Sequence, residues 1–403
     1  MNAQARLDRA ALYLSVIQFL FATTWVVYVI YLGDLLDRVG IGREYLIWFI
    51  LLDQAVFAVS DTIMGYAADK VERFIGELGP RIIAVNAVSC LAFVALPFLP
   101  ELVSDKLSPV LFTVLLVIWI ATSSVLRAPP LVLLTKHAAR PKVPRLAALS
   151  LLGLALGGAL APYLGLVLKS IDPAVPFVVT AASLILATLG LSRVERITRE
   201  LPEQDKQPAA TIVAPNRFAV ALLLVAILLI AFGFQIHAFL NSKPLYLNFA
   251  TKEQLVLLLP LFWIGFKLLV LPCAAAARRY GPAPILAAGS LAGALALLLA
   301  GEADSLGMLI AAQMLAGGAW GIVFTTGVST ALNLGTTGRE GLILGLWFTM
   351  ISVAALTRAG LVAGGLKANA ELSVLLPWAP GLLWLLGGLT LLCLAYITGK
   401  KNL

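Results

Sequence analysis

The chain has 403 residues, of which 61% are hydrophobic and only 12% are charged. Soluble domains carry about 25% charged residues, so this composition excludes a water-soluble globular fold and predicts that lipid solvates most of the surface. The net charge of +8 does not indicate a nucleic-acid-binding protein, because the basic residues lie in short loops between apolar runs rather than on one soluble face.

Apolar runs long enough to cross a bilayer recur along the whole sequence. A membrane-spanning helix needs about 20 apolar residues. The first run is too long for a signal peptide, so we expect it to be retained as a helix. Together the runs predict an all-α membrane protein with twelve transmembrane helices, at residues 10–32, 45–67, 81–100, 108–134, 145–168, 174–192, 217–240, 254–276, 282–301, 305–332, 341–366 and 375–397.

The longest polar stretch divides the predicted spans into two groups of six. It has mixed charges and several prolines, which is typical of a linker. We therefore expect a six-helix bundle over residues 1–193, a cytoplasmic linker over 194–216 and a second six-helix bundle over 217–403. Most loop Lys and Arg residues fall on one side of the spans, which predicts cytoplasmic termini and an inner-membrane location. We expect a monomer.

The loop after the second span carries a charged motif. It reads Gly65-Tyr-Ala-Ala-Asp69-Lys70-Val-Glu72-Arg73. This segment resembles the Gly-x-x-x-Asp-Arg/Lys-x-Gly-Arg/Lys signature of the major facilitator superfamily, with Glu72 in place of the second glycine. The resemblance implies two six-helix bundles that alternate access to a central site, with spans one, four, seven and ten lining the cavity. It also implies a gating role for Asp69.

Two further segments resemble narrower groups of transporters. Residues 157–165 are similar to the Gly-x-x-x-Gly-Pro-x-x-Gly motif of antiporters, with Ala161 in place of a glycine. Residues 61–65 are similar to the Asp-Pro-x-x-Gly segment of the glycoside–cation symporter branch, which includes melibiose permease, with Thr62 in place of the proline. Arg127 occupies the place comparable to a sodium-site acid of that branch, which argues against sodium coupling of that kind.

Five ionisable residues are predicted to lie at bilayer depth, where charges are costly and are functional candidates. They are Asp53, Asp61, Arg127, Lys267 and Arg358. Counting about 1.5 Å per helical residue puts Asp61 and Arg127 at a similar inner depth, which predicts an ion pair. Two roles stay open for the pair: it holds spans two and four together, or it is a switch in which protonation of Asp61 frees Arg127.

The other three charges are assigned by depth and by elimination. Asp53 and Arg358 fall in the outer half, and spans two and eleven face each other in the superfamily. The resemblance therefore implies an Asp53–Arg358 contact that acts as an outer gate, closed when the protein faces inward and broken when it faces outward. Lys267 lies near mid-bilayer without an acid in its own half. We expect it to be uncharged, to bond a backbone carbonyl, or to bind an anionic group of the substrate.

Polar and aromatic residues at mid-depth complete the predicted site. His237 is a candidate proton carrier or an outer-end hydrogen-bond donor. The predicted coupling and gating residues are Asp53, Asp61 and Asp69. The predicted substrate-binding residues are Lys267, Arg358, Arg127, Trp25, Tyr28, Gln235, His237, Gln313 and Trp320, and further lining candidates are Gln18, Asn241 and Asn333.

These features favour a secondary active transporter that moves a small anionic organic solute by alternating access, coupled to protons. The sequence has no ATP-binding Gly-x-x-x-x-Gly-Lys-Ser/Thr loop and no cluster typical of an enzyme, so we expect neither catalysis nor a cofactor or metal. Two alternatives stay open: an exporter that acts as an antiporter of amphipathic compounds, and a non-transporting sensor or assembly factor.

Overall fold

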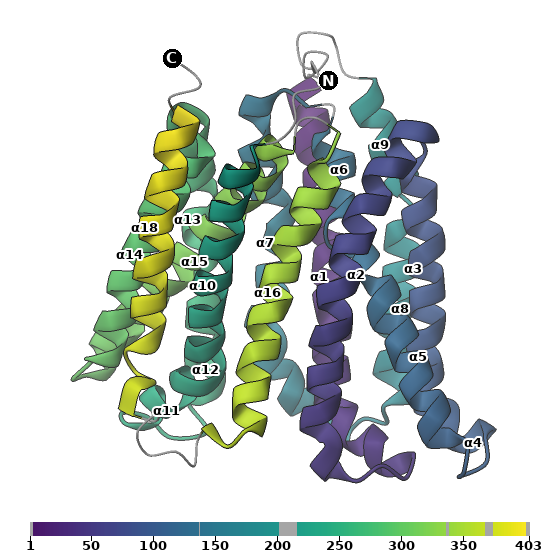
Figure 1. The fold of residues 1–403 in the computed structure, drawn as a ribbon. Coiled ribbons are helices and arrows are strands. Elements are labelled where there is room, and N and C mark those ends of the chain that lie inside the picture. The colour runs from purple at the N-terminus through teal and green to yellow at the C-terminus, as the bar shows by residue number, and fades with distance from the viewer. Residues whose placement is uncertain (1–2, 137, 201–215, 336–337, 367–373, 400–403) are drawn as a thin grey trace.

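The computed structural model describes residues 3–136, 138–200, 216–335, 338–366 and 374–399. Within these ranges, twelve helical segments are long and apolar enough to cross a membrane. The prediction of an all-α fold with twelve spans is therefore confirmed. The first helix begins and the last helix ends at the same end of the bundle (Figure 1), which we call the terminal side.

Over the described residues, the first group of spans contains nine α-helices, because several spans are interrupted. The turn after the second span is made by Gly76, whose φ of 74° suits glycine. The helices are α1 (Ala3–Arg38), α2 (Leu46–Phe74), α3 (Leu78–Ala95), α4 (Leu99–Leu102), α5 (Ser108–Ser123), α6 (Pro129–Thr135), α7 (Val143–Val167), α8 (Ala174–Thr188) and α9 (Leu191–Arg199).

The second group repeats the pattern of long helices with short connections. Its first span contains a π-helical turn at His237–Asn241. The α-helices are α10 (Arg217–Ile236), α11 (Ser242–Leu247), α12 (Leu255–Leu258), α13 (Pro260–Tyr280), α14 (Pro282–Gly301), α15 (Leu306–Leu334), α16 (Glu340–Ala363) and α18 (Ala379–Gly399).

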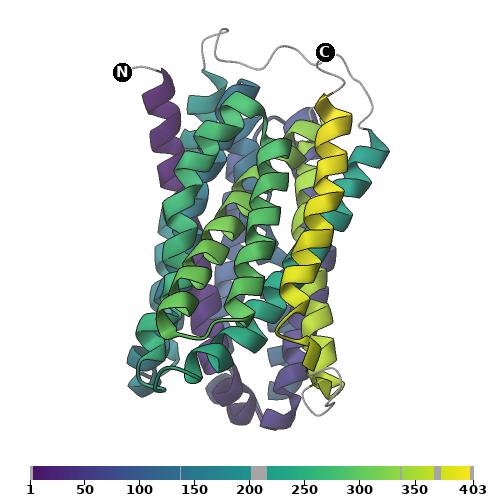
Figure 2. The same cartoon turned by 90° about the vertical axis from the view of Figure 1, so that its left-hand side faces the viewer.

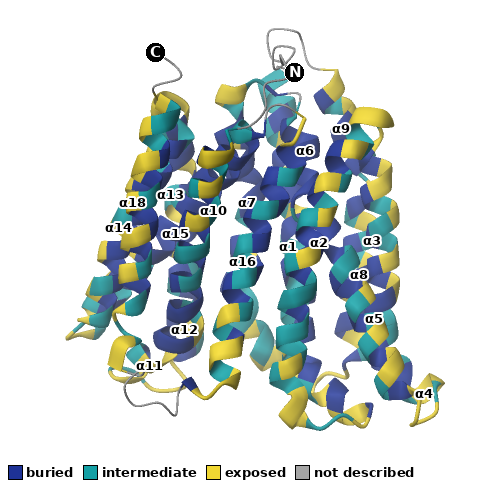
Figure 3. Ribbon diagram, viewed as in Figure 1, coloured by how far each residue is buried: buried dark blue, intermediate teal, exposed yellow. Residues whose placement is uncertain are grey.

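The two groups lie side by side (Figure 1), and Figure 2 shows the second group facing the viewer. Two helix pairs make most of the contact between them: α2 packs against α16, and α7 packs against α13. Figure 3 shows buried residues on the surfaces where helices meet and exposed residues on the outside of the bundle. Many exposed residues are large and apolar, such as Leu186 with 68% exposure and Tyr396 with 64%. Lipid would cover this outer surface.

The sixth span extends further than its apolar run. The predicted linker begins at residue 194, whereas α9 continues to Arg199. The carboxylate of Glu195 accepts hydrogen bonds from the backbone N–H groups of Leu78 (3.0 Å) and Gly79 (2.9 Å). Glu195 thus satisfies donors that the start of α3 leaves unpaired, which gives this polar extension a structural purpose. Residues 201–215 of the predicted linker lie outside the described residues.

Candidate functional site

Span four is broken just before its basic residue. A 3-10 turn ending at Leu126 follows α5, and α6 restarts at Pro129. Pro130 has no N–H group, so it cannot donate to the carbonyl of Leu126 four residues earlier, as a helix would require. Gln18 supplies the missing donor from α1, with 2.7 Å between its Nε2 and the Leu126 oxygen. The break places Arg127 between two helical segments, where its side chain turns into the bundle.

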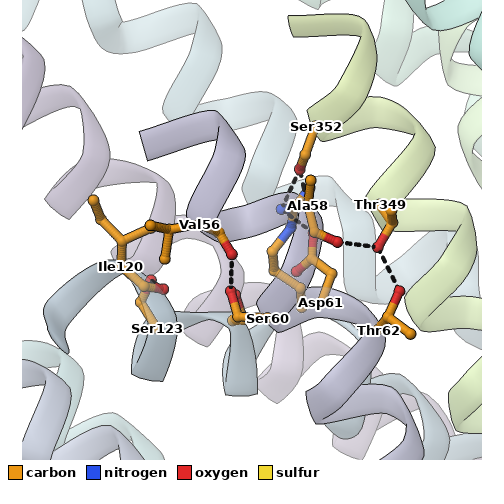
Figure 4. A network of polar contacts seen from close by, with 11 residues as sticks. Val56, Ala58, Ser60, Asp61, Thr62, Ile120, Ser123, Thr349 and Ser352 are labelled. Carbon is orange, nitrogen blue, oxygen red and sulfur yellow. Dashed lines mark hydrogen bonds and ion pairs between the residues drawn. The ribbon is translucent and has the colours of Figure 1, made fainter. Parts of the chain in front are cut away.

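The predicted ion pair between Asp61 and Arg127 is present. Arg127 Nη1 donates to Asp61 Oδ2 at 2.5 Å and to Ser352 Oγ at 3.0 Å. Ser352 Oγ in turn lies 3.3 Å from the same carboxylate oxygen. Figure 4 shows Asp61 of α2 facing Ser352 of α16, next to a hydrogen bond that joins the hydroxyls of Thr62 and Thr349 (2.8 Å). Polar contacts therefore tie the two groups of helices together at the level of the buried charges.

Two phenyl rings enclose the guanidinium of Arg127. Its Cζ atom lies 4.9 Å from the ring centroid of Phe57 and 4.8 Å from that of Phe348. Cation–π contacts of this kind stabilise a cation that is removed from water. The Nε and Nη2 groups of Arg127 make no hydrogen bond to any described residue, and its side chain keeps 15% exposure. Arg127 therefore retains donors for a further partner.

A cavity of about 310 Å³ lies between the two groups of helices, beside Arg127. Aromatic rings are the most numerous side chains in its wall. Among the described residues that line it, Arg127 alone is charged, and two glutamines supply the only amide side chains. No group of three His, Cys, Asp or Glu side chains suited to a metal ion occurs in the described part of the chain. The lining residues are Gln18, Phe21, Ala22, Trp25, Val26, Gln54, Phe57, Arg127, Leu131, Leu151, Leu154, Gly158, Phe234, Trp263, Phe266, Trp320, Phe324, Phe348 and Ile351.

Three of the predicted substrate-binding residues line this cavity. They are Arg127, Trp25 and Trp320, and Gln18 joins them from the wider set of candidates. Trp320 stacks on Phe234 with ring centroids 4.4 Å apart and an angle of 7° between the planes. The cavity thus offers flat aromatic faces and one guanidinium.

The structure does not contain the predicted outer gate between Asp53 and Arg358. Asp53 accepts a hydrogen bond from the Tyr28 hydroxyl at 2.8 Å, within the first group of helices. Arg358 Nε donates to Gln235 Oε1 at 3.1 Å, and its guanidinium lies over the ring of Phe239, within the second group. The two side chains thus do not meet in this conformation. The gate is predicted to close only when the protein faces inward, so it stays a prediction.

Lys267 also lies outside the central cavity. Its neighbour Phe266 lines the cavity, and each residue of an α-helix is rotated by about 100° from the one before. Lys267 is therefore turned toward the side of α13, where it is partly exposed and has no hydrogen bond or ion pair with the described residues. Lys267 does not line this cavity, and its role in binding an anionic group stays a prediction.

The other predicted polar residues of spans seven and ten form a separate buried cluster. His237 Nε2 and Gln313 Oε1 are 2.9 Å apart, and Gln313 Nε2 donates to Ser242 Oγ at 3.3 Å. Asn241 donates to the carbonyl of Leu376 at 2.6 Å. None of these side chains lines the central cavity, and Asn333 lies at a different pocket.

Asp69 connects the two groups of helices at the terminal side. Its carboxylate accepts hydrogen bonds from the backbone N–H groups of Gly341 (2.7 Å) and Leu342 (2.8 Å), at the start of α16. The first N–H groups of a helix have no partner within it, and the positive end of the helix dipole favours an anion there. Asp69 of α2 thus accepts hydrogen bonds from two backbone N–H groups that the start of α16 would otherwise leave unpaired.

Several residues of the site were missed by the sequence analysis. Phe57 lies one helical turn before Asp61, and Phe348 one turn before Ser352, so an i, i+4 search around the buried acid would have found Phe57. Ser352 and Phe348 carry no comparable signal, because they lie in an apolar span far along the chain.

Twelve helical spans in two groups, with a cavity between them, define a polytopic membrane protein. The model of the Major Facilitator Superfamily matches residues 14–357, so the chain belongs to this superfamily. This match does not confirm the narrower, melibiose permease-like branch of the superfamily. No curated protein matches the chain.

Solved structures of similar fold cover nearly the whole chain. The human organic anion transporter MFSD10 (TETRAN) has a TM-score of 0.71 and 15% identity, over 97% of this chain and 100% of that one. A bacterial homologue of the iron transporter ferroportin, in an outward-facing state, has a TM-score of 0.68 and 12% identity, over 98% and 100%. The proton:xylose symporter XylE, bound to 6-bromo-6-deoxy-D-glucose, has a TM-score of 0.64 and 12% identity, over 99% and 96%. At these identities the likeness is one of fold alone.

Proposed function

We propose that this protein is a secondary active transporter that moves an amphipathic organic anion together with protons by alternating access. The substrate binds in the central cavity, with its anionic group at Arg127 and its apolar body between the aromatic rings. MFSD10, which shares the fold, is an organic anion transporter, so this class of solute is the first to test.

The observation that supports the proposal is the single cation in an aromatic cavity. Arg127 lines the cavity, and its Nε and Nη2 groups have no partner among the described residues. Charge-assisted hydrogen bonds to a carboxylate are strong, and a guanidinium can offer two in parallel. Trp320 and Trp25 line the same cavity and offer apolar faces. A small neutral sugar would use few of these features.

The ion pair of Asp61 and Arg127 supports proton coupling. Asp61 is 1% exposed, so its charge depends on the neighbouring guanidinium. Protonation of Asp61 would leave Arg127 without a counter-ion, and an anionic substrate would restore the balance. Proton and anion then favour each other's binding, as thermodynamic linkage requires. The alternative role, in which the pair only holds the helices together, predicts no such coupling.

The orientation and organisation are part of the same proposal. Both termini lie in the cytoplasm, since the loops of the terminal side carry most of the basic residues. The protein is a monomer of the inner membrane, with bundles over residues 1–193 and 217–403 joined by the linker 194–216. The melibiose permease-like branch remains a hypothesis that rests on residues 61–65 alone.

Uptake into proteoliposomes tests the function. The purified protein is reconstituted with an inwardly directed proton gradient, and accumulation of a panel of aryl carboxylates is compared with that of the matched neutral amides. We expect gradient-driven accumulation of carboxylates only. Arg127→Gln should lower the initial rate by about tenfold or more, because one charge-assisted hydrogen bond is worth about 1.5–3 kcal/mol. Lys267→Gln is the matched control and should keep the wild-type rate.

Further outcomes separate the alternatives. Asp61→Asn should still exchange internal for external substrate but should lose accumulation driven by the proton gradient. Equal uptake of carboxylates and amides would overturn the anion proposal. Accumulation driven only by an outwardly directed proton gradient would favour the exporter, and the absence of stoichiometric uptake or exchange would favour a sensor or assembly factor.

A further inference from the structure

A second cavity, of about 670 Å³, lies at the terminal side between the start of α1 and the end of the sixth span. It shares no residue with the central cavity. Its wall is strongly basic, in contrast to the aromatic wall of the central cavity. The lining residues with charged side chains are Arg6, Arg9, Arg193, Arg196 and Glu200.

Most of the positive charge in this cavity is not neutralised. Arg6 pairs with Glu200 at 3.2 Å, and this is the one ion pair that its charged residues make with described residues. The three other arginines are exposed and make no hydrogen bond or ion pair with the described part of the chain. Like charges held this close repel one another. An anion in the cavity would relieve the repulsion of Arg9, Arg193 and Arg196.

The basic residues are continuous with an apolar, exposed surface on both helices. On α1, Leu12 (46% exposed) and Val16 (50% exposed) follow Arg9 at the i+3 and i+7 positions, so they share its face. On the sixth span, Leu189 (54% exposed) and Leu186 (68% exposed) precede Arg193 at the matching i−4 and i−7 positions. Leu189 itself lines the cavity.

The apolar surface next to the arginines favours a phospholipid over a free anion. A free phosphate would use the arginines and leave the leucines uncovered. A phospholipid presents a phosphate at the membrane surface and acyl chains below it. Basic pockets between membrane-spanning helices are suited to anionic headgroups. Tyr13 lines the pocket, and its hydroxyl donates to the carbonyl of Ala187. This hydrogen bond joins α1 to the sixth span beside the pocket.

We propose that this pocket binds the headgroup of an anionic phospholipid. Arg9, Arg193 and Arg196 contact the phosphate. The acyl chains run along the exposed apolar residues of α1 and the sixth span, with Leu12 and Leu189 nearest to the headgroup. The bound lipid ties the first span to the sixth within the first group of helices, and its site is independent of the transported solute.

Lipid binding to the purified, full-length protein in a neutral detergent tests the proposal. Native mass spectrometry gives the dissociation constants for phosphatidylglycerol and, as the zwitterionic comparison, for phosphatidylcholine. We expect phosphatidylglycerol to bind more tightly, and the loss of three arginines to weaken its binding by about 100-fold. The test variant is Arg9→Gln/Arg193→Gln/Arg196→Gln.

A control variant removes the same charge from the same side of the bundle. It is Arg81→Gln/Arg278→Gln/Arg279→Gln, which changes three exposed arginines outside the pocket. We expect its affinity for phosphatidylglycerol to stay within about threefold of wild type, since these three arginines do not line the pocket in which the phosphate would bind. A third variant with lysine at positions 9, 193 and 196 should retain most of the binding, which separates loss of charge from loss of fold.

Three results would overturn the proposal. The first is an equal loss of lipid in the test and control variants, which indicates a non-specific effect of net charge. The second is displacement of phosphatidylglycerol by inorganic phosphate at concentrations near the dissociation constant of the lipid, which indicates a site for a free anion. The third is unchanged binding of phosphatidylglycerol in the test variant.

Discussion

The contact between α2 and α16 differs between its two ends. At the terminal side the backbones touch: a Cβ atom added to Gly65 would lie 2.1 Å from the carbonyl oxygen of Gly341. Toward the opposite side, a Cβ atom on Gly360 would lie 3.9 Å from its nearest neighbour, a side-chain carbon of Leu51, which is ordinary contact. Asp69 adds two hydrogen bonds across the tight end.

The difference indicates which end of the contact holds the two groups of helices together in this conformation. Between the ends, Asp61, Arg127 and Ser352 form the polar group beside the cavity. At the looser end, Asp53 and Arg358 each bond within their own group of helices. We infer that the terminal side is closed here, and that alternating access would require these contacts to separate.

The largest expected effect lies at the buried ion pair. Asp61→Asn leaves Arg127 without a counter-ion, which we expect to lower the free energy of unfolding by about 3–5 kcal/mol. Denaturant titration in detergent micelles measures it, with Asp105→Asn in an exposed loop as the control. Equal stability of the two variants would show that the guanidinium does not depend on Asp61.

The next largest effect is expected for a substitution at the tight end of the contact between α2 and α16. Gly65→Ala forces a methyl group against the backbone of α16, which we expect to cost about 1–3 kcal/mol and to slow transport. Gly360→Ala makes the same chemical change at the loose end of the same helix pair and should be nearly neutral. The comparison fails if both alanines have the same effect on stability and uptake rate.

The cap at the start of α16 should contribute less. Asp69→Asn keeps one oxygen but loses the charge that the helix dipole favours, which we expect to cost about 1 kcal/mol. The uptake rate and the free energy of unfolding are measured beside Glu77→Gln, an exposed acid on the same side. A change no larger than that of Glu77→Gln would show that the Asp69 cap does not contribute to the contact at the terminal side.

The smallest effect is expected for the coupling energy between Asp53 and Arg358, whose side chains do not contact each other. In a double-mutant cycle of Asp53→Asn and Arg358→Gln, the coupling energy should stay below about 0.5 kcal/mol, as for independent sites. The same cycle built on Tyr28→Phe and Asp53→Asn should give a larger value, because these side chains share a hydrogen bond. A strong Asp53–Arg358 coupling would restore the outer gate in another conformation.

The sequence was sufficient for the spans and for one contact between them. Apolar length predicts membrane helices well because lipid leaves few alternatives to a helix. Depth along two helices of the same group predicted the pair of Asp61 and Arg127. The same reasoning did not fix the directions in which Asp53, Arg358 and Lys267 point. A one-residue step turns a side chain by about 100°, and no count of residues from a loop fixes the rotation of one helix against another.

The cavity wall was only partly predictable for a related reason. Apolar residues cover both the lipid-facing and the inward surfaces of these helices, so hydrophobic periodicity is weak and Phe348 cannot be told from a lipid-facing phenylalanine. Trp25 and Trp320 were found because they are aromatic residues at mid-depth on spans one and ten, which the superfamily resemblance implies line the cavity. The sequence analysis predicted span four as continuous and missed its break, although Pro129 and Pro130 mark the place. Gln18, which bonds the freed carbonyl, lies more than a hundred residues away in the sequence.

The glycines of the tight end also bear on how fast the molecule can move. Gly65, Gly341 and Gly345 bring backbone against backbone, so no long side chain has to find its rotamer each time the contact re-forms. Ordering a long side chain costs up to about 2 kcal/mol of conformational entropy, whereas glycine has no side chain to order. Closure at this end is therefore a search over the position of two rigid helices, and its speed should depend on the bilayer's viscosity more than on side-chain rearrangement.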